Sequence, residues 1–183
     1  MSKVDKKLLI LDLDETLIYA TEVRLPCDPD FVVGQYSVYK RPYLESFADY
    51  CFANFEVAVW TTSTESYASE IVEHIFGGER KLRFLWSRDR CTWIFDEDSY
   101  ERIQIKKLEK VRRLGFRADS IIVVDDTPSV WKLSYGNLVK VDKFEGDPAD
   151  DTLNDLPRFL DLIKEVPNIR AVEKRNWRSR IKG

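Results

Sequence analysis

The stretch LLILDLDETL, residues 8–17, decides the fold. It begins with four consecutive apolar residues, which is typical of a short strand buried on both faces of a parallel sheet. Two further runs have the same character, VAVW at 57–60 and IIVV at 121–124. Weaker strand signals lie at 82–86 and 138–141. The chain therefore carries several candidate strands for one buried sheet.

Helical periodicity separates these strands. Apolar residues spaced by three and four positions predict helices over 44–51, 67–75, 108–114 and 156–163. Alternation of strands and helices predicts an α/β fold with three layers, a Rossmann-like parallel sheet that has helices on both faces. Two segments interrupt the alternation, 19–40 and 87–105, and we expect small β insertions there. Neither segment is long enough for a large cap domain.

The chain length of 183 residues favours a single domain, which we expect to span residues 1–169. The remaining residues, 170–183, contain six Lys or Arg and one Glu, and we expect a basic, exposed tail or loose helix there. Such a tail could attract nucleic-acid phosphates. The whole chain has a net charge of −3, so its overall charge gives no indication of nucleic-acid binding.

Cysteine usage and hydropathy bear on the cellular compartment. Cys27, Cys51 and Cys91 are widely separated and form no CxxC pair. The N-terminal residues lead directly into the first strand without the pattern of a signal peptide, and the apolar runs are too short to cross a membrane. These features predict a cytoplasmic or other reducing intracellular compartment and no membrane partner. The single histidine, His74, disfavours paired-histidine metal sites and a Ser-His-Asp triad.

Acidic pairs follow two of the predicted strands. Asp12 and Asp14 come after the first run, and Asp125 and Asp126 come after IIVV. Residues two apart on a strand point to the same side, and ligands bind at the carboxyl ends of strands in open α/β sheets. Carboxylates this close repel each other unless a cation lies between them, and oxygen ligands suit Mg²⁺. The alternative interpretation is helix capping by Asp14 and turn formation at 125–128.

Hydroxyl and ammonium side chains also lie directly after predicted β segments. Thr61 and Thr62 directly follow VAVW, where hydroxyl and backbone N–H groups can bind a phosphate. Helix capping is the simpler role for them. Lys106 follows the second insertion and opens a helix, and its alternative is an ordinary surface lysine. Taken together, these groups are expected to converge on one crevice.

The motifs, in this order, resemble a known superfamily. DLDETL at 12–17, WTTS at 60–63, a lysine and VVDDTP at 123–128 are similar to the four motifs of the haloacid dehalogenase superfamily. With YKRPY at 39–43, the chain more narrowly resembles the small phosphatases that act on the C-terminal domain of RNA polymerase II. The resemblance covers residues 7–165 and implies a Mg²⁺-dependent phosphomonoesterase with an aspartyl-phosphate intermediate.

The resemblance also implies a role for each motif residue. Asp12 would be the nucleophile, and Asp14 would protonate the leaving group and then deprotonate water. Thr61 and Thr62 would bind the phosphoryl group, and Lys106 would neutralise phosphate charge.

The resemblance implies four aspartates as Mg²⁺ ligands. Asp12, the backbone carbonyl of Asp14 and Asp126 would bind the ion, and Asp125 would act through water. The interval from Lys106 to Asp125 is longer than in the family, which leaves Lys106 and Lys107 as alternatives for the functional lysine.

The expected substrate is a phosphorylated macromolecule, in the first place a protein carrying phosphoserine or phosphothreonine. Two alternatives stay open: a phosphatase acting on a nucleic-acid end or a small metabolite, and an interaction module with weak or no catalysis. The presence of both Asp12 and Asp14 argues against the interaction module.

Overall fold

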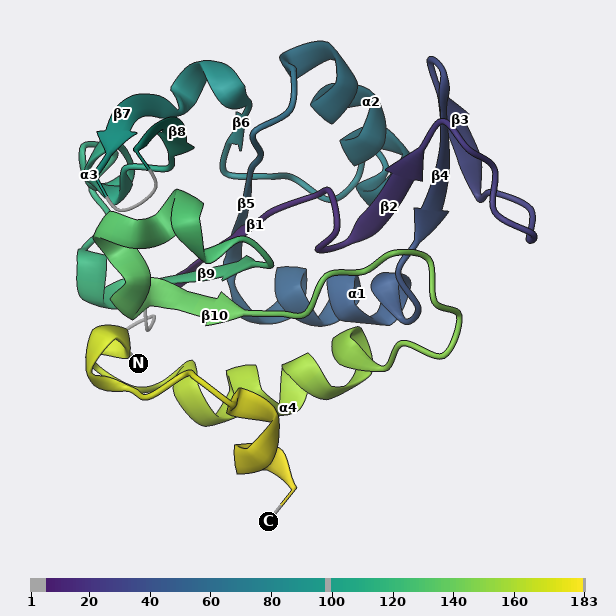
Figure 1. Ribbon diagram of the computed structural model, residues 1–183. Helices are drawn as coiled ribbons and strands as arrows, with labels where there is room; N and C mark the ends of the chain where they lie inside the picture. The colour runs from purple at the N-terminus through teal and green to yellow at the C-terminus, as the bar shows by residue number, and fades with distance from the viewer. Residues whose placement is uncertain (1–5, 98–99, 183) are drawn as a thin grey trace.

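The computed structural model describes residues 6–97 and 100–182. At its centre lies a parallel sheet of five strands in the order β10-β9-β1-β5-β6 (Figure 1). The strands are β1 (Leu8–Leu11), β5 (Glu56–Trp60), β6 (Leu85–Trp86), β9 (Ile121–Asp125) and β10 (Leu138–Lys140). Each lies within or close to one of the predicted apolar runs. The central position of β1 agrees with its complete burial.

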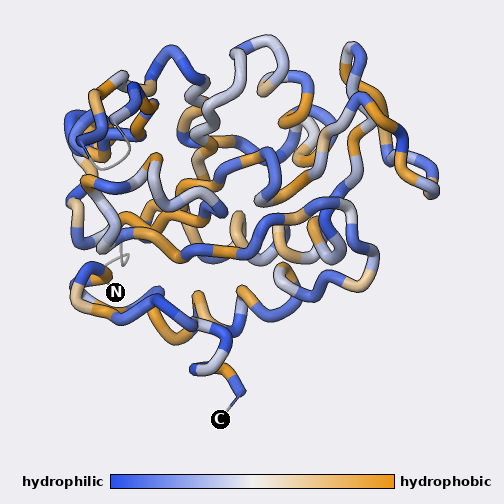
Figure 2. Tube along the Cα trace, in the orientation of Figure 1, coloured by the Kyte–Doolittle hydropathy of each residue, from blue (hydrophilic) through white to orange (hydrophobic). Residues whose placement is uncertain are grey.

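Helices and apolar side chains cover both faces of this sheet. Leu9 and Leu11 of β1 face one core, and Leu8 and Ile10 face the other, because successive side chains on a strand alternate. The first core is covered by α1 (Leu44–Asn54), α2 (Glu65–Phe76) and α4 (Thr152–Ile163). The second is covered by α3 (Leu108–Arg112) and the 3-10 segment η3 (Pro128–Asn137). Figure 2 shows the hydrophobic residues concentrated along the central strands. The predicted three-layer α/β fold is confirmed.

Helix α3 is shorter than its pattern predicts. The apolar stripe over 108–114 includes Leu114, yet the helix ends at Arg112 and the Leu114 side chain is 52% exposed. Gly115 follows with φ of 97°, a left-handed conformation that glycine adopts without steric cost. The chain therefore turns away before the third residue of the stripe reaches the core.

Both predicted insertions are small β structures. The first is an antiparallel sheet in the order β2-β4-β3, made of β2 (Ile18–Thr21), β3 (Phe31–Val33) and β4 (Tyr36–Lys40). This sheet fills the segment 19–40, where a small β insertion was expected, and its first strand begins one residue earlier, at Ile18. The second insertion contains the 3-10 turn η1 (Arg88–Arg90) and the hairpin of β7 (Thr92–Asp96) and β8 (Glu101–Ile105).

The C-terminal segment packs against the domain. The last elements of the chain are the 3-10 helices η4 (Ile169–Ala171) and η5 (Trp177–Ile181). A further 3-10 turn, η2 (Ala118–Ser120), lies directly before β9. Ile169, Trp177 and Ile181 are all buried, and the Trp177 ring lies 5.8 Å from Phe159 of α4 between centroids. Of the two expectations for this segment, the exposed tail is wrong, because apolar residues spaced by four positions insert beside α4, and a short helix forms at η5. The domain boundary before residue 170 stays a prediction.

Candidate active site

The carboxyl ends of β1, β5 and β9 form one edge of the sheet. Leu11 pairs with Val59 on one side and with Val124 on the other, so the residues that follow these strands come together. The backbone N–H of Asp12 continues the ladder by donating to the Val124 carbonyl over 3.1 Å. Thr61 directly follows β5, and its side chain is buried. Polar side chains are therefore held at fixed positions on a rigid, apolar sheet.

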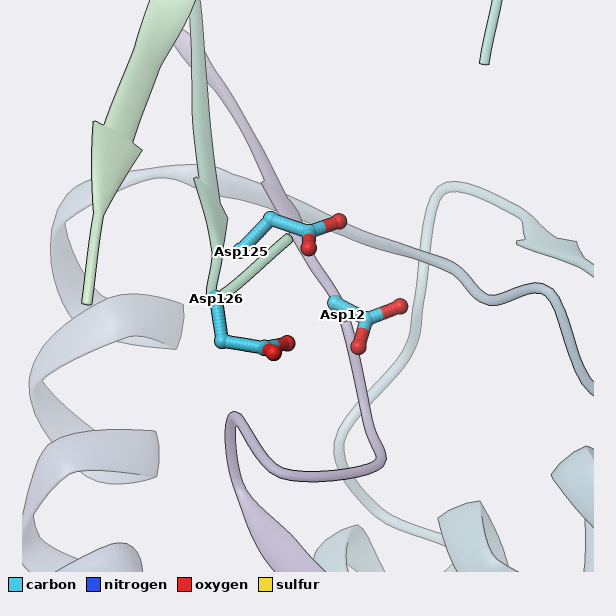
Figure 3. A group of neighbouring side chains, drawn as sticks. All are labelled: Asp12, Asp125 and Asp126. Carbon is cyan, nitrogen blue, oxygen red and sulfur yellow. The ribbon is translucent and has the colours of Figure 1, made fainter. Parts of the chain in front are cut away.

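Three buried carboxylates gather at this edge. Asp12, Asp125 and Asp126 each place a carboxylate oxygen within 4.8 Å of the others. Figure 3 shows that they come from two neighbouring strand ends and that their carboxylates face a common space. Asp14, which was expected to share this space, is not in the group.

Lys106 lies against the acidic group. Its ammonium Nζ is 2.6 Å from Oδ1 of Asp12 and 2.6 Å from Oδ2 of Asp125. Burial opposes the charged form of this amine, but the two carboxylates outweigh burial and raise the pKa of Lys106 above its usual range. The ammonium also lies 5.6 Å from the centroid of the Trp131 ring. Lys106 is therefore a permanent positive charge within the group.

Neighbouring donors orient the other two carboxylates. Asp125 accepts hydrogen bonds from the Thr127 backbone N–H (2.9 Å) and from the Trp131 indole N–H (2.8 Å). Asp126 accepts from the hydroxyls of Thr16 (3.1 Å) and Thr127 (2.9 Å). These bonds fix the rotamers of both acids before any ligand arrives.

The charge balance of the group fits a divalent cation. Three buried carboxylates face the single ammonium of Lys106, which leaves negative charge uncompensated. Burial raises the pKa of Asp12 well above its usual range, Lys106 acts against this rise, and the neighbouring Asp125 adds to it. A cation bound between the carboxylates would remove this repulsion, and oxygen donors suit Mg²⁺ or Ca²⁺.

Asp14 has different surroundings from Asp12. Strand β1 ends at Leu11, so Asp14 lies in the turn that leads into β2 and does not follow the alternation of a strand. Its carboxylate accepts a hydrogen bond from the Tyr67 hydroxyl (2.6 Å) and one from the Ser63 hydroxyl (2.7 Å). Burial, followed by the charge of Asp14, raises the pKa of Tyr67, so this phenol stays a donor. The Asp14 side chain is thus held by α2 and the residues before it.

The remaining predicted residues divide between buried and exposed positions. The Thr61 hydroxyl oxygen accepts from the Ser63 backbone N–H over 3.1 Å, and its own hydrogen is left to donate. Thr62 is exposed. Lys107 is the residue that precedes α3, whereas Lys106 contacts the acids.

Several residues at this edge were not identified from the sequence. Tyr67 lies in the segment 67–75 that was expected to form a helix, and Ser63 lies in the WTTS motif, but neither was assigned a role. No side-chain cap is formed at the start of α2, and both hydroxyls bind Asp14 instead. Trp131, which donates to Asp125, lies in none of the motifs. Thr16, which donates to Asp126, lies within DLDETL, but no role was assigned to it. Hydroxyl partners of this kind depend on tertiary packing.

Comparison with known proteins identifies relatives over nearly the whole chain. The sequence model of the NLI interacting factor-like phosphatases matches residues 7–170. CTD nuclear envelope phosphatase 1 of Xenopus laevis is 29% identical over 96% of this chain and 75% of its own length. A probable C-terminal domain small phosphatase of Dictyostelium discoideum is 31% identical over 94% of this chain and 56% of its own length.

A solved structure has the same fold. The structure of Fcp1, an essential RNA polymerase II CTD phosphatase, superposes with a TM-score of 0.55 at 22% identity. The match covers 97% of this chain, which spans about half (48%) of the solved chain.

The predicted cellular compartment needs correction. The expectation of a cytoplasmic or other reducing compartment is wrong, because relatives that match 96% of the chain are named nuclear envelope phosphatases. Among the described residues, no helix combines the length and the apolar character needed to cross a bilayer.

The acidic strand ends and the buried lysine thus occur in a fold that a phosphatase of known structure shares. The resemblance to the haloacid dehalogenase superfamily and to its small C-terminal-domain phosphatases is confirmed by sequence and by structure. This chain belongs to the family of NLI interacting factor-like phosphatases.

Proposed function

We propose that this protein is a Mg²⁺-dependent phosphatase that removes phosphate from phosphoserine or phosphothreonine in a protein, with Asp12 as the nucleophile. One observation carries this assignment: the Lys106 ammonium lies 2.6 Å from both Asp12 and Asp125, inside a buried group of three carboxylates. A lysine so placed favours the anionic form of Asp12 against the effect of burial, and it provides positive charge where phosphate oxygens arrive.

In the first step, a carboxylate oxygen of Asp12 attacks phosphorus while the bond from phosphorus to the ester oxygen breaks. The ester oxygen leaves as an alkoxide and takes a proton from Asp14. The products are an aspartyl-phosphate on Asp12 and the dephosphorylated alcohol. The hydroxyls of Ser63 and Tyr67 support this role, because they hold the Asp14 carboxylate in one orientation.

In the second step, water attacks the phosphorus of the aspartyl-phosphate. Asp14, now a carboxylate, accepts a proton from that water, and the Asp12 carboxylate leaves. Inorganic phosphate is released, and both aspartates return to their starting protonation states. The same acid thus serves both halves of the reaction.

Mg²⁺ would be held by Asp12, Asp126 and the Asp14 backbone carbonyl, with Asp125 acting through water. When bound, the ion reduces the repulsion between the carboxylates and the phosphate dianion. The uncompensated charge of the three buried acids supports this choice of site.

Thr61 and Thr62 would bind the transferring phosphoryl group. The Thr61 hydroxyl oxygen accepts from the Ser63 N–H, and within residues 6–97 and 100–182 its hydrogen has no acceptor. Thr62 is exposed beside it and can reach a ligand from solvent.

A protein substrate is supported by two observations. Relatives that match most of this chain are named CTD nuclear envelope phosphatase 1 and probable C-terminal domain small phosphatase. The β7–β8 hairpin, which ends directly before Lys106, carries Trp93 and Phe95 with side chains 57% and 59% exposed. An extended peptide could lie along this hairpin while its phosphate reaches Asp12.

The test compares kcat/KM for a phosphoserine peptide, a 3′-phosphorylated oligonucleotide and a sugar phosphate. We expect the peptide to be the preferred substrate. Excess chelator should stop turnover, Mg²⁺ should restore it, and Ca²⁺ should not, because Ca²⁺ takes more ligands at longer distances. Preference for the oligonucleotide would refute the protein substrate, and full activity in chelator would refute the metal requirement.

A further inference from the structure

A cavity lies beside β10, the edge strand of the central sheet, on the side away from β9. Its volume is about 850 Å³, within the range of small-molecule sites. Its lining residues come from two segments, 135–142 and 170–179. In Figure 1 the second segment is the yellow stretch that runs beside β10 and α4. The cavity is thus built by a part of the chain that supplies nothing to the acidic group.

The inner wall of the cavity is apolar and well anchored. Leu138 and Trp177 line it, and both are almost fully buried. The Trp177 indole N–H donates to the Lys140 backbone carbonyl over 2.9 Å, which ties η5 to β10. Tyr135 lines the cavity with a half-exposed ring. A ligand entering here would meet a fixed surface.

Positive charge dominates the rim. Five cationic side chains line the cavity, against the two acids Asp142 and Glu173; the five are Lys140, Arg170, Lys174, Arg175 and Arg178. Arg175 pairs with Glu173, and Arg178 pairs with Asp151 outside the cavity. Within residues 6–97 and 100–182, the side chains of Lys140 and Arg170 form no hydrogen bond or ion pair. Two cations are therefore left to meet a ligand.

Lys174 adds a buried ammonium to this rim. Its side chain is only 5% exposed, and its Nζ donates to the carbonyls of Ile169 (2.7 Å) and Val172 (2.6 Å). An ammonium has three N–H donors, so one is left for another acceptor. Burial lowers the pKa of Lys174; Glu173 opposes this effect, and the like charges of Arg170 and Arg180 reinforce it. An anion bound in the cavity would reduce the repulsion between these positive charges.

We propose that this cavity binds the phosphate group of a small ligand. Arg170 provides a planar fork that suits two phosphate oxygens, and Lys140 and Lys174 add point charges to the lining of the same cavity. The apolar wall at Leu138 and Trp177 would contact the uncharged part of the ligand. This site is separate from the one at Asp12, so the proposal does not depend on the catalytic assignment.

The experiment follows amide and indole resonances by NMR while inorganic phosphate is added to the full-length protein. We expect saturable shifts at the Trp177 indole N–H and the Gly136 amide, both of which lie on the cavity wall. Binding at Asp12 is read separately at the Thr62 amide. Sodium chloride at matched ionic strength serves as the blank, because general screening of charge is not saturable.

The substitutions K140Q and R170Q, made together, should weaken phosphate binding at the cavity about tenfold or more, since each removes a charged hydrogen bond. Both residues are exposed, so the fold should persist. The matched control is K81Q with R113Q, which removes two exposed cations elsewhere. If only Thr62 responds to phosphate, or if the K140Q/R170Q pair binds like the control pair, the proposal is wrong.

A second arm identifies the source of the phosphate. Cosedimentation is measured with phosphatidylcholine vesicles that contain or lack a phosphatidylinositol phosphate. Cosedimentation that requires Lys140 and Arg170 would assign a lipid headgroup. Cavity shifts with inorganic phosphate, but without cosedimentation, would assign a soluble ligand. Absence of both responses would overturn the proposal.

Discussion

Asp12 and Asp14 lie two positions apart in one motif, yet the fold gives them unlike surroundings. Asp12 is buried against the Lys106 ammonium, next to two further carboxylates. Asp14 is half-buried in the following turn, and its partners are the uncharged hydroxyls of Ser63 and Tyr67. The first environment is ionic and belongs to the sheet, whereas the second consists of neutral donors that belong to α2 and the loop before it.

Because the two environments differ, one short motif can serve two chemical tasks. A nucleophile must stay anionic and must not move, and the Asp12 carboxylate is held by a permanent cation on a rigid strand end. A general acid and base must give up and accept a proton, and the Asp14 carboxyl is held in place by uncharged hydroxyls instead of a cation. Two carboxyl groups whose environments differ in this way are expected to take different roles.

The largest effect is expected from D12N. A neutral amide cannot attack phosphorus, so kcat should fall by about 10⁴-fold or more, the scale seen when a nucleophile or its partner is removed from another enzyme. The measurement is turnover of a phosphoserine peptide, with the circular dichroism spectrum as the control for folding. Turnover close to that of the wild type would contradict the role of Asp12.

The next effect concerns the cation of the ionic environment. K106A leaves two buried carboxylates without their partner, which costs about 3–5 kcal/mol in the free energy of unfolding. Activity should fall by about 10²-fold or more, as when an electrostatic donor is removed from a site. Denaturant unfolding and turnover are measured together. K107A is the matched control and should change both quantities little. If K107A has the larger effect, Lys107 is the functional lysine and the assignment of Lys106 is wrong.

D14N probes the neutral environment. Loss of general acid–base catalysis should lower kcat for a phosphoserine peptide by about 10²–10⁴-fold. The loss should be much smaller in the phosphoryl-transfer step with p-nitrophenyl phosphate, because its leaving group departs as a stable phenolate without a proton. Rapid-quench measurement of that step gives the comparison. If the rate of phosphoryl transfer falls equally with both substrates, Asp14 is not the general acid.

The smallest effect is expected from Y67F, which removes one hydroxyl from Asp14 and keeps the ring. One hydrogen bond contributes about 0.5–1.5 kcal/mol, so kcat for the peptide should fall up to about tenfold while KM stays unchanged. Y36F is the control, since Tyr36 packs edge-on against the Tyr67 ring without contacting Asp14 through a hydrogen bond. Equal behaviour of the two variants would mean that the Tyr67 hydroxyl does not position Asp14.

The parts of this molecule that follow from local pattern could be predicted from sequence. The runs at 8–11, 57–60 and 121–124 became the buried strands, and Asp12, Asp125 and Asp126, which follow the first and last of them, met at one edge. The expected insertions at 19–40 and 87–105 also formed β structure. In each case the pattern of a few consecutive residues is enough to predict the element.

The parts that depend on distant packing could not be predicted. The C-terminal residues are rich in Arg and Lys, so composition predicts exposure, yet Trp177 and Ile181 reach the side of α4. Tyr67 fits the apolar stripe of α2, and its bond to Asp14 exists only because α2 starts beside the turn after β1. Contacts between side chains that are far apart in the sequence do not change the hydrophobic periodicity of either segment, so the periodicity cannot predict them.

The most direct test of the central claim is to trap the phosphoryl group on the protein. The D14N variant, mixed with p-nitrophenyl phosphate and quenched in acid, should accumulate the intermediate, because phosphoryl transfer to Asp12 continues while hydrolysis is slow. Mass spectrometry should then find one added phosphoryl group, in the peptide that contains Asp12, and D12N should carry none. Rapid release of nitrophenol with no phosphoryl group on Asp12, or with the group on another residue, would contradict the account.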